Sequence, residues 1–185
     1  ISGQEFLVPN QSVTFLADLT HFDEKSGLVT KQKIFDEIFG LIEQAEHYIL
    51  LDLFLFNDFL GNSTKASRAL SSELTRALIN KKKSKPDIDI IFITDPINQI
   101  YGEIKAEHLT ALSEAGIVVI ETDLKRLRDS NPMYSVWWRS GLQYLPVGFI
   151  KLSNPFVFGG QRVGLDSYFR LLNFKANHRK LLVAD

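Results

Sequence analysis

Apolar and polar residues follow one another along this chain in blocks whose periods predict alternating helices and strands. Three segments with apolar residues at helical spacing predict amphipathic helices, at 32–47, 65–80 and 104–116. Three nearly continuous apolar runs predict strands buried on both faces, at 48–56, 88–96 and 117–122. Because helices and strands alternate, the pattern favours a mainly parallel sheet flanked by helices and joined by right-handed crossovers. The predicted fold class is therefore α/β.

Shorter patterns account for much of the remaining chain. The alternation in SVTFLAD predicts a strand at 12–18, and DEKSG at 23–27 has the polar, glycine-ended composition of a turn. The lysine-rich KKKSKPD at 81–87 is interpreted as a solvated, charged loop, and RKLLVAD at 179–185 as a buried strand.

The segment at about 124–175, before the last strand, breaks the alternation and is interpreted as an insertion rich in aromatic residues and glycine. Between residues 130 and 161 the only charged side chains are Arg139 and Lys151, among three prolines and four glycines, so no long helix is expected. The longest uncharged run, at 140–150, is too short to span a bilayer.

Length and composition narrow the class of protein. With 185 residues, of which 45% are hydrophobic and 23% charged, the chain fits one ordinary domain and is too short for two. The absence of cysteine excludes disulfides, thiolate catalysis and cysteine-bound zinc. No targeting signal is visible, so the location stays open between the cytoplasm and a membrane surface.

Charge is distributed unevenly along the chain. Residues 124–184 hold ten Lys and Arg against two acids, a net charge of +8, although the whole chain carries only −1. Ten aromatic residues also lie between Asp123 and His178. Trp137 and Trp138 next to Arg139 suit the headgroup region of an anionic bilayer, so they are weak candidates for peripheral membrane contact. The alternatives are stacking on single-stranded nucleic acid, or a loop that packs its aromatic residues inside a missing C-terminal half of the protein.

The most reactive group of side chains is at the end of the sequence, where His178, Lys180 and Asp185 have the spacing H-x-K-x-x-x-x-D. In an extended strand His178 and Lys180 share a face, about 6 to 7 Å apart. Imidazole can attack phosphorus while an ammonium group compensates the charge on phosphoryl oxygens. Asp185 is an odd number of residues from His178, so it is expected to cap the strand end or to orient a histidine. On chemistry alone, the spacing is equally compatible with a purely structural role.

These residues carry a resemblance to a known family. HRKLLVAD resembles the H-x-K-x4-D motif of the phospholipase D superfamily, and YILLDLFLFND and IDIIFITDP resemble its first two core strands. The resemblance implies a phosphohistidine intermediate released by water or by an alcohol. It further implies that His178 is the nucleophile or its acid–base counterpart, that Lys180 binds phosphate, that Asp185 supports the motif, and that no metal or other cofactor is needed.

The family assembles its site from two such motifs, and this sequence contains one, because His21, His47 and His108 lack the matching lysine. Residues 1–185 are therefore expected to be an N-terminal half-domain that is inactive alone. The second motif would come from a C-terminal half of the same full-length chain or from a homodimer partner.

Three carboxylates outside the motif are weaker candidates. Asp52 lies within a buried strand and is interpreted as structural. Asp58 and Asp95 follow strands, where open α/β sheets bind ligands, and together with Arg139 they are weak candidates for substrate binding. The favoured function is that of a phosphodiesterase or phosphatidyltransferase acting on phospholipids, and the alternatives are a nuclease of the same superfamily or a non-catalytic binding module.

Overall fold

The structure, a computed structural model, describes residues 5–59, 68–157 and 160–185. The chain divides into two compact units, one ending at Leu41 and the other running from Ile42 to Asp185. Helix α1 (Lys33–Gln44) runs across this division. It matches the helix predicted at 32–47.

The N-terminal unit contains a hairpin. Strand β1 (Leu19–Asp23) pairs antiparallel with β2 (Gly27–Lys31). The Asp23 carboxylate accepts the amides of Lys25 and Ser26 in the turn, and Gly27 adopts φ 74°, which favours glycine. The predicted turn at 23–27 is confirmed. The strand predicted at 12–18 is wrong: these residues are not in a strand, and Val13 and Phe15 are exposed, so their alternation has no core to face.

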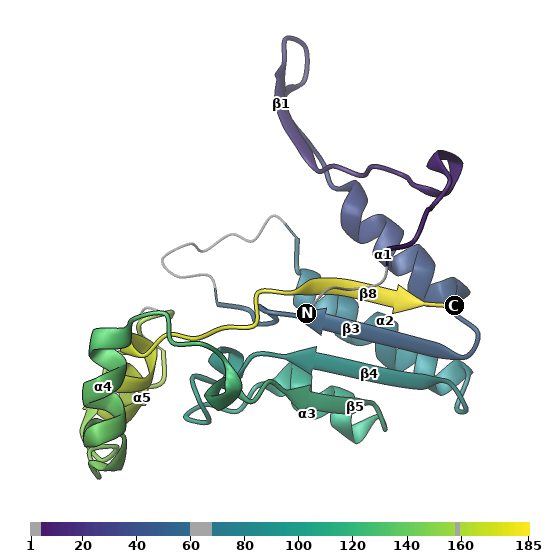
Figure 1. The fold of residues 1–185 in the computed structure, drawn as a ribbon. Coiled ribbons are helices and arrows are strands. Elements are labelled where there is room, and N and C mark those ends of the chain that lie inside the picture. Colours follow the sequence, from purple (N-terminus) through teal and green to yellow (C-terminus); the bar gives the residue numbers. More distant parts are fainter. Residues whose placement is uncertain (1–4, 60–67, 158–159) are drawn as a thin grey trace. The chain divides into compact units, whose positions relative to one another are not determined.

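The C-terminal unit is built on a four-stranded sheet with the order β5-β4-β3-β8 (Figure 1). Its strands are β3 (Tyr48–Leu53), β4 (Asp89–Thr94), β5 (Val118–Glu121) and β8 (Lys180–Ala184). Strands β3, β4 and β5 are mutually parallel, whereas β8 runs antiparallel to β3. An α/β fold with a mainly parallel sheet is thus confirmed.

One face of the sheet forms the core of this unit. Alternate residues of β3 and β4 are fully buried, and Figure 1 draws helices α2 (Leu70–Ser84) and α3 (Glu107–Glu114) on the far side of the sheet. The largest buried side chains include Ile49, Leu51, Ile90, Phe92, Leu74, Leu78 and Leu112. They follow the strand period of two and the helical spacing that the sequence showed.

Helix α2 differs from the prediction at its end. Lys81, Lys82 and Lys83 form its last turn and are not a loop. Lysine is a good helix former, and positive charge is favourable at a helix C-terminus. Lys82 also donates to the carbonyls of Pro86 and Ile88, which closes the turn into β4. The start of the predicted helix at 65–67 lies outside the described residues.

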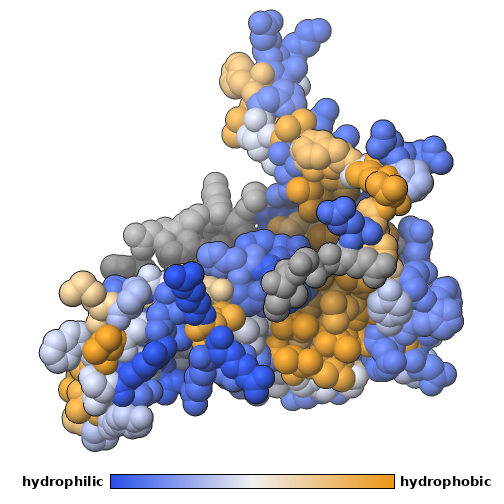
Figure 2. All heavy atoms as spheres, viewed as in Figure 1, coloured by the Kyte–Doolittle hydropathy of each residue, from blue (hydrophilic) through white to orange (hydrophobic). Residues whose placement is uncertain are grey.

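The other face of the sheet is apolar and partly exposed. Four apolar or aromatic residues on this face, in β3, β5 and β8, are between 42% and 54% exposed: Tyr48, Val118, Ile120 and Leu181. Figure 2 shows a continuous hydrophobic area where Figure 1 draws β3, β4 and β5.

The insertion is more ordered than its sequence suggests. It contains α4 (Pro132–Ser140), the short pair β6 (Lys151–Leu152) and β7 (Val163–Gly164), and α5 (Leu165–Leu172). Helix α4 begins after Asn131, whose side chain accepts the Tyr134 amide, and it ends at Gly141. The Tyr134 hydroxyl donates to the Phe169 carbonyl, and the Ser135 hydroxyl donates to Asn173, so α4 packs on α5.

Candidate active site

His178 and Lys180 come together at the beginning of β8, beside Phe54. The ring centroids of His178 and Phe54 are 4.3 Å apart, and the Lys180 ammonium lies 5.6 Å from the centroid of the same phenyl ring. Lys180 Nζ also donates to the His178 carbonyl at 2.8 Å. Both side chains are exposed, and among the described residues no hydrogen bond reaches a ring nitrogen of His178. Its imidazole is thus accessible to an incoming group.

The backbone of Phe54 is held from two sides. Its amide donates to the Arg179 carbonyl at 3.2 Å, which extends the β3–β8 ladder past the end of both strands. Its carbonyl accepts from the side-chain amide of Asn98 at 2.9 Å, and Asn98 is almost completely buried. The position of Phe54, whose ring contacts His178 and Lys180, is therefore fixed by the sheet and by the segment after β4.

Asn177 anchors the residue before the motif histidine. Its side-chain amide donates to both Asp52 oxygens, at 3.0 and 3.3 Å, and to the Thr122 hydroxyl at 3.4 Å. Its backbone amide donates to Asp95 at 3.1 Å. These three partners lie at the carboxyl ends of β3, β4 and β5, so Asn177 ties the segment that carries His178 to three parallel strands.

Asp95 is the one weak carboxylate candidate that the structure brings close to His178. Burial raises the pKa of the Asp95 carboxyl, whereas the amides of Ile97 and Asn177 and the charge of His178 act in the opposite direction. A cationic His178 ring and the Asp95 carboxylate therefore interact favourably. Burial also raises the pKa of the nearby Tyr101 hydroxyl to about 12, and the negative charge of Asp95 adds to that increase.

Asp58 belongs to a different group of side chains. Its carboxylate accepts from His108 Nε2, and the other ring nitrogen of His108 contacts the Thr75 hydroxyl at 3.1 Å. Asp52, interpreted from the sequence as structural, is buried and bonded to Asn177, with the Arg179 guanidinium 3.9 Å away.

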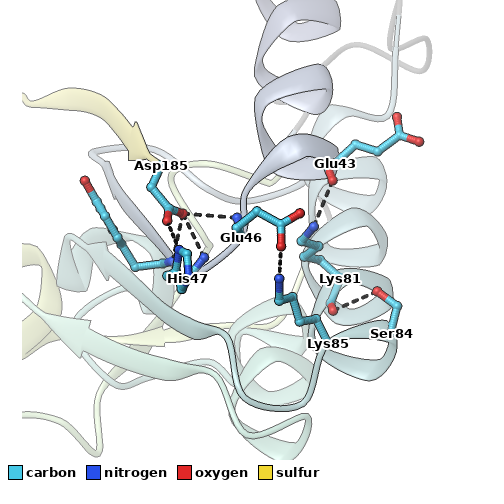
Figure 3. Close-up of polar contacts among 8 residues, drawn as sticks. Glu43, Glu46, His47, Lys81, Ser84, Lys85 and Asp185 are labelled. Carbon is cyan, nitrogen blue, oxygen red and sulfur yellow. Dashed lines mark hydrogen bonds and ion pairs between the residues drawn. The ribbon is translucent and has the colours of Figure 1, made fainter.

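Asp185 follows the last residue of β8, at the opposite end of the strand from His178. Figure 3 shows it beside Glu46 and His47. Its Oδ1 accepts the backbone amides of Glu46, His47 and Tyr48, at 3.1, 2.8 and 3.1 Å, and its Oδ2 is bonded to His47 Nδ1. The His47 amide, followed by the other donors, holds the pKa of Asp185 well below its usual range. Asp185 thus fastens the loop between α1 and β3, and the histidine it contacts is His47.

Arg139, Trp137 and Trp138 lie on α4. The Arg139 guanidinium pairs with Asp129, whose carboxylate is also 2.8 Å from the Lys175 ammonium. Trp137 is 68% exposed, while Trp138 is partly buried. The two tryptophans therefore differ in what they can contact.

Two residues that help to form the site, Asn177 and Phe54, were not predicted from the sequence. Asn177 is 125 residues from Asp52 and 82 from Asp95, so no local spacing signals the bonds between them. In the sequence, Phe54 is one of several apolar residues in a run that predicts a buried strand. Its position beside the motif depends on the register between β3 and β8, in which Leu53 lies opposite Lys180.

No group of three or more His, Asp or Glu side chains suited to a metal ion occurs within the described residues. In the same part of the chain, no helix is long and apolar enough to cross a membrane. Comparison with family models, with curated proteins and with solved structures gives no match to this chain.

Proposed function

We propose that this chain contributes one half of a phospholipase D-like site, which cleaves or transfers phosphodiesters through a phosphohistidine. The observation that carries the proposal is the grouping of an accessible His178 with Lys180 beside one ring, on a segment anchored through Asn177. An exposed imidazole next to a primary ammonium suits an anionic phosphoryl group.

In the proposed reaction a His178 ring nitrogen attacks phosphorus, and the bond from phosphorus to the leaving alcohol breaks. The leaving oxygen takes a proton from the histidine of the second motif. Water or another alcohol, losing its proton to that histidine, then attacks the phosphohistidine and restores His178. The His178 ring is cationic while it bears the phosphoryl group, and the neighbouring Asp95 carboxylate stabilises that charge.

Lys180 has the second chemical role. Its ammonium compensates the charge that grows on the non-bridging phosphoryl oxygens. The ammonium donates to the His178 carbonyl and lies over Phe54, and these contacts hold it beside the imidazole. We assign phospholipids as the substrate class, because the insertion next to the site carries charge-poor runs with exposed aromatic residues.

The test measures hydrolysis of phosphatidylglycerol, and transfer of its phosphatidyl group to butanol, by the protein that also carries a second motif. His178→Asn is expected to abolish both activities, while His21→Asn, an exposed histidine on β1, serves as the matched control and keeps them. Formation of phosphatidylbutanol indicates a covalent intermediate that an alcohol can intercept. Turnover by His178→Asn at the wild-type rate would exclude the proposed role.

The number of motifs provides a separate test. A monomer of residues 1–185 is expected to show negligible turnover of bis(p-nitrophenyl) phosphate, because the counterpart histidine is absent. Turnover by that monomer, lost on His178→Asn, would refute the half-site. Cleavage of single-stranded oligonucleotides in place of lipid would assign the nuclease function instead.

A further inference from the structure

Helix α4 presents an apolar face to solvent. Met133, Val136 and Trp137 have the i, i+3, i+4 spacing of one helical face, and they are 81%, 65% and 68% exposed. The adjacent side of the helix is occupied, because Tyr134 and Ser135 bond to α5 and to Asn173. The outer face is thus left open while the inner one is packed.

Further large apolar side chains are exposed in the segment after α4. Tyr144, Leu145 and Phe149 are also exposed, so six large apolar or aromatic side chains project within 17 residues. Isolated exposed apolar residues are normal, but a helix face that exposes three large apolar side chains marks an interaction surface. These six residues together are named the α4 surface.

The charges next to the α4 surface are mostly positive. Lys125, Arg126 and Arg128 are exposed just before α4; Arg126 pairs with Asp123 at 3.3 Å, and Asp129 is engaged by Arg139 and Lys175. The α4 surface itself contains no charged residue. An apolar and aromatic patch beside basic side chains complements the headgroup boundary of an anionic bilayer.

We propose that the α4 surface docks on an anionic lipid bilayer. Met133, Val136 and Trp137 enter the headgroup boundary, and Lys125, Arg126 and Arg128 face lipid phosphates. Nucleic acid fits less well, because its backbone would require basic residues among the rings and not beside them. Docking would also hold the His178 site near lipid, because α5 joins the α4 region to the segment that bears His178. This consequence rests on the proposed function, whereas bilayer binding does not.

The two tryptophans of the chain make the proposal directly measurable, because both lie on α4 and differ in exposure. Trp138→Phe leaves Trp137 as the sole indole, and Trp137→Phe leaves Trp138. Each variant is mixed with vesicles of phosphatidylcholine alone or with 30 mol% phosphatidylglycerol, at low and high salt. The Trp137 emission is expected to shift to the blue and to be quenched by brominated lipid on anionic vesicles, with much smaller changes for Trp138.

Sedimentation with the same vesicles supplies a second readout. Met133→Ser/Val136→Ser is expected to weaken binding at least fivefold at both salt concentrations, while high salt also weakens wild-type binding through the basic residues. The matched control is Phe22→Ser/Leu28→Ser, an exposed cross-strand apolar pair on the hairpin, which should bind as the wild type does. Far-UV circular dichroism checks that both variants are folded.

The outcomes separate this proposal from the catalytic one. His178→Asn should bind vesicles normally, so a loss of turnover with retained binding leaves docking intact. The docking proposal would be overturned if the wild type fails to bind anionic vesicles. It would also be overturned if aqueous iodide still quenches Trp137 in the bound protein. Quenching of Trp137 by single-stranded oligonucleotides but not by brominated lipid would assign the α4 surface to nucleic acid.

Discussion

At the start of β8, His178 and Lys180 lie exposed beside Phe54, whereas at its end Asp185 is engaged by three backbone amides and by His47. His178 and Asp185 are seven positions apart in the sequence, which corresponds to about 23 Å along an extended chain. One sequence motif thus spans two environments. Its first two residues remain available to a ligand, and its last residue is committed to holding a loop. Regular spacing in a motif therefore does not imply a shared site.

After the loss of turnover expected for His178→Asn, the largest effect at the histidine end is expected from Lys180. Lys180→Ala should lower kcat about 10²- to 10³-fold, or about 2.7 to 4 kcal/mol, as removal of an oxyanion donor does. Arg179→Ala removes the adjacent cation, which is exposed and 3.9 Å from Asp52, and is the matched control. Steady-state rates on one phosphodiester compare the two variants. Equal losses would mean that general positive charge, and not the position of Lys180, matters.

The next effect concerns the anchor that positions the histidine end. Asn177→Ala leaves the buried Asp52 carboxylate without its amide donor, which should lower the free energy of unfolding by about 1 to 3 kcal/mol. It should also lower kcat, because His178 loses its fixed neighbour. Urea unfolding measures the first effect, with the exposed Asn80→Ala on α2 as the control. Unchanged stability would show that the Asp52 contact contributes nothing.

A smaller, pH-dependent effect is expected at the aspartate end. The folded-state pKa of Asp185 is depressed below its ordinary value of 3.8, so its contribution to stability is present above that value. The contribution is lost as pH falls from 3.8 through the lower folded-state pKa. Asp185→Asn should therefore be less stable than wild type at pH 7, and the difference should shrink as the pH falls below 3.8. Thermal unfolding across this range measures it, and a difference independent of pH would contradict the ionised role.

The sequence predicted the helices and strands that carry the two ends of β8 better than it predicted the contacts of individual residues. The runs that became β3, β4 and β5 are apolar on both faces, and the helices between them have clear periods, so the parallel part of the sheet was readable. The strand predicted at 12–18 was wrong because period-two alternation alone does not provide a partner strand. The lysine run joined α2 because helix propensity and the helix dipole outweighed its polarity.

The candidate site could be predicted only in part, because some of its contacts join segments that are distant in the sequence. His178 and Lys180 are two residues apart, so local geometry predicted that they would lie close together. Asn177, Phe54 and Asp95 reach them only through the pairing of β8 with β3 and of β3 with β4. Such contacts depend on register between distant segments, which neither spacing nor composition encodes.

The His178 end of β8 is expected to act in catalysis, and the Asp185 end is expected to stabilise the fold. One paired measurement tests this division. In a protein that supplies the second motif that the proposed function requires, His178→Asn and Asp185→Asn are compared with wild type for phosphodiester turnover per folded molecule and for Tm at pH 7. His178→Asn should lose turnover and keep the wild-type Tm, because an exposed ring contributes little to stability. Asp185→Asn should lower Tm while its folded molecules keep turnover. An Asp185→Asn protein with wild-type Tm and no turnover, or an active His178→Asn protein, would contradict the account.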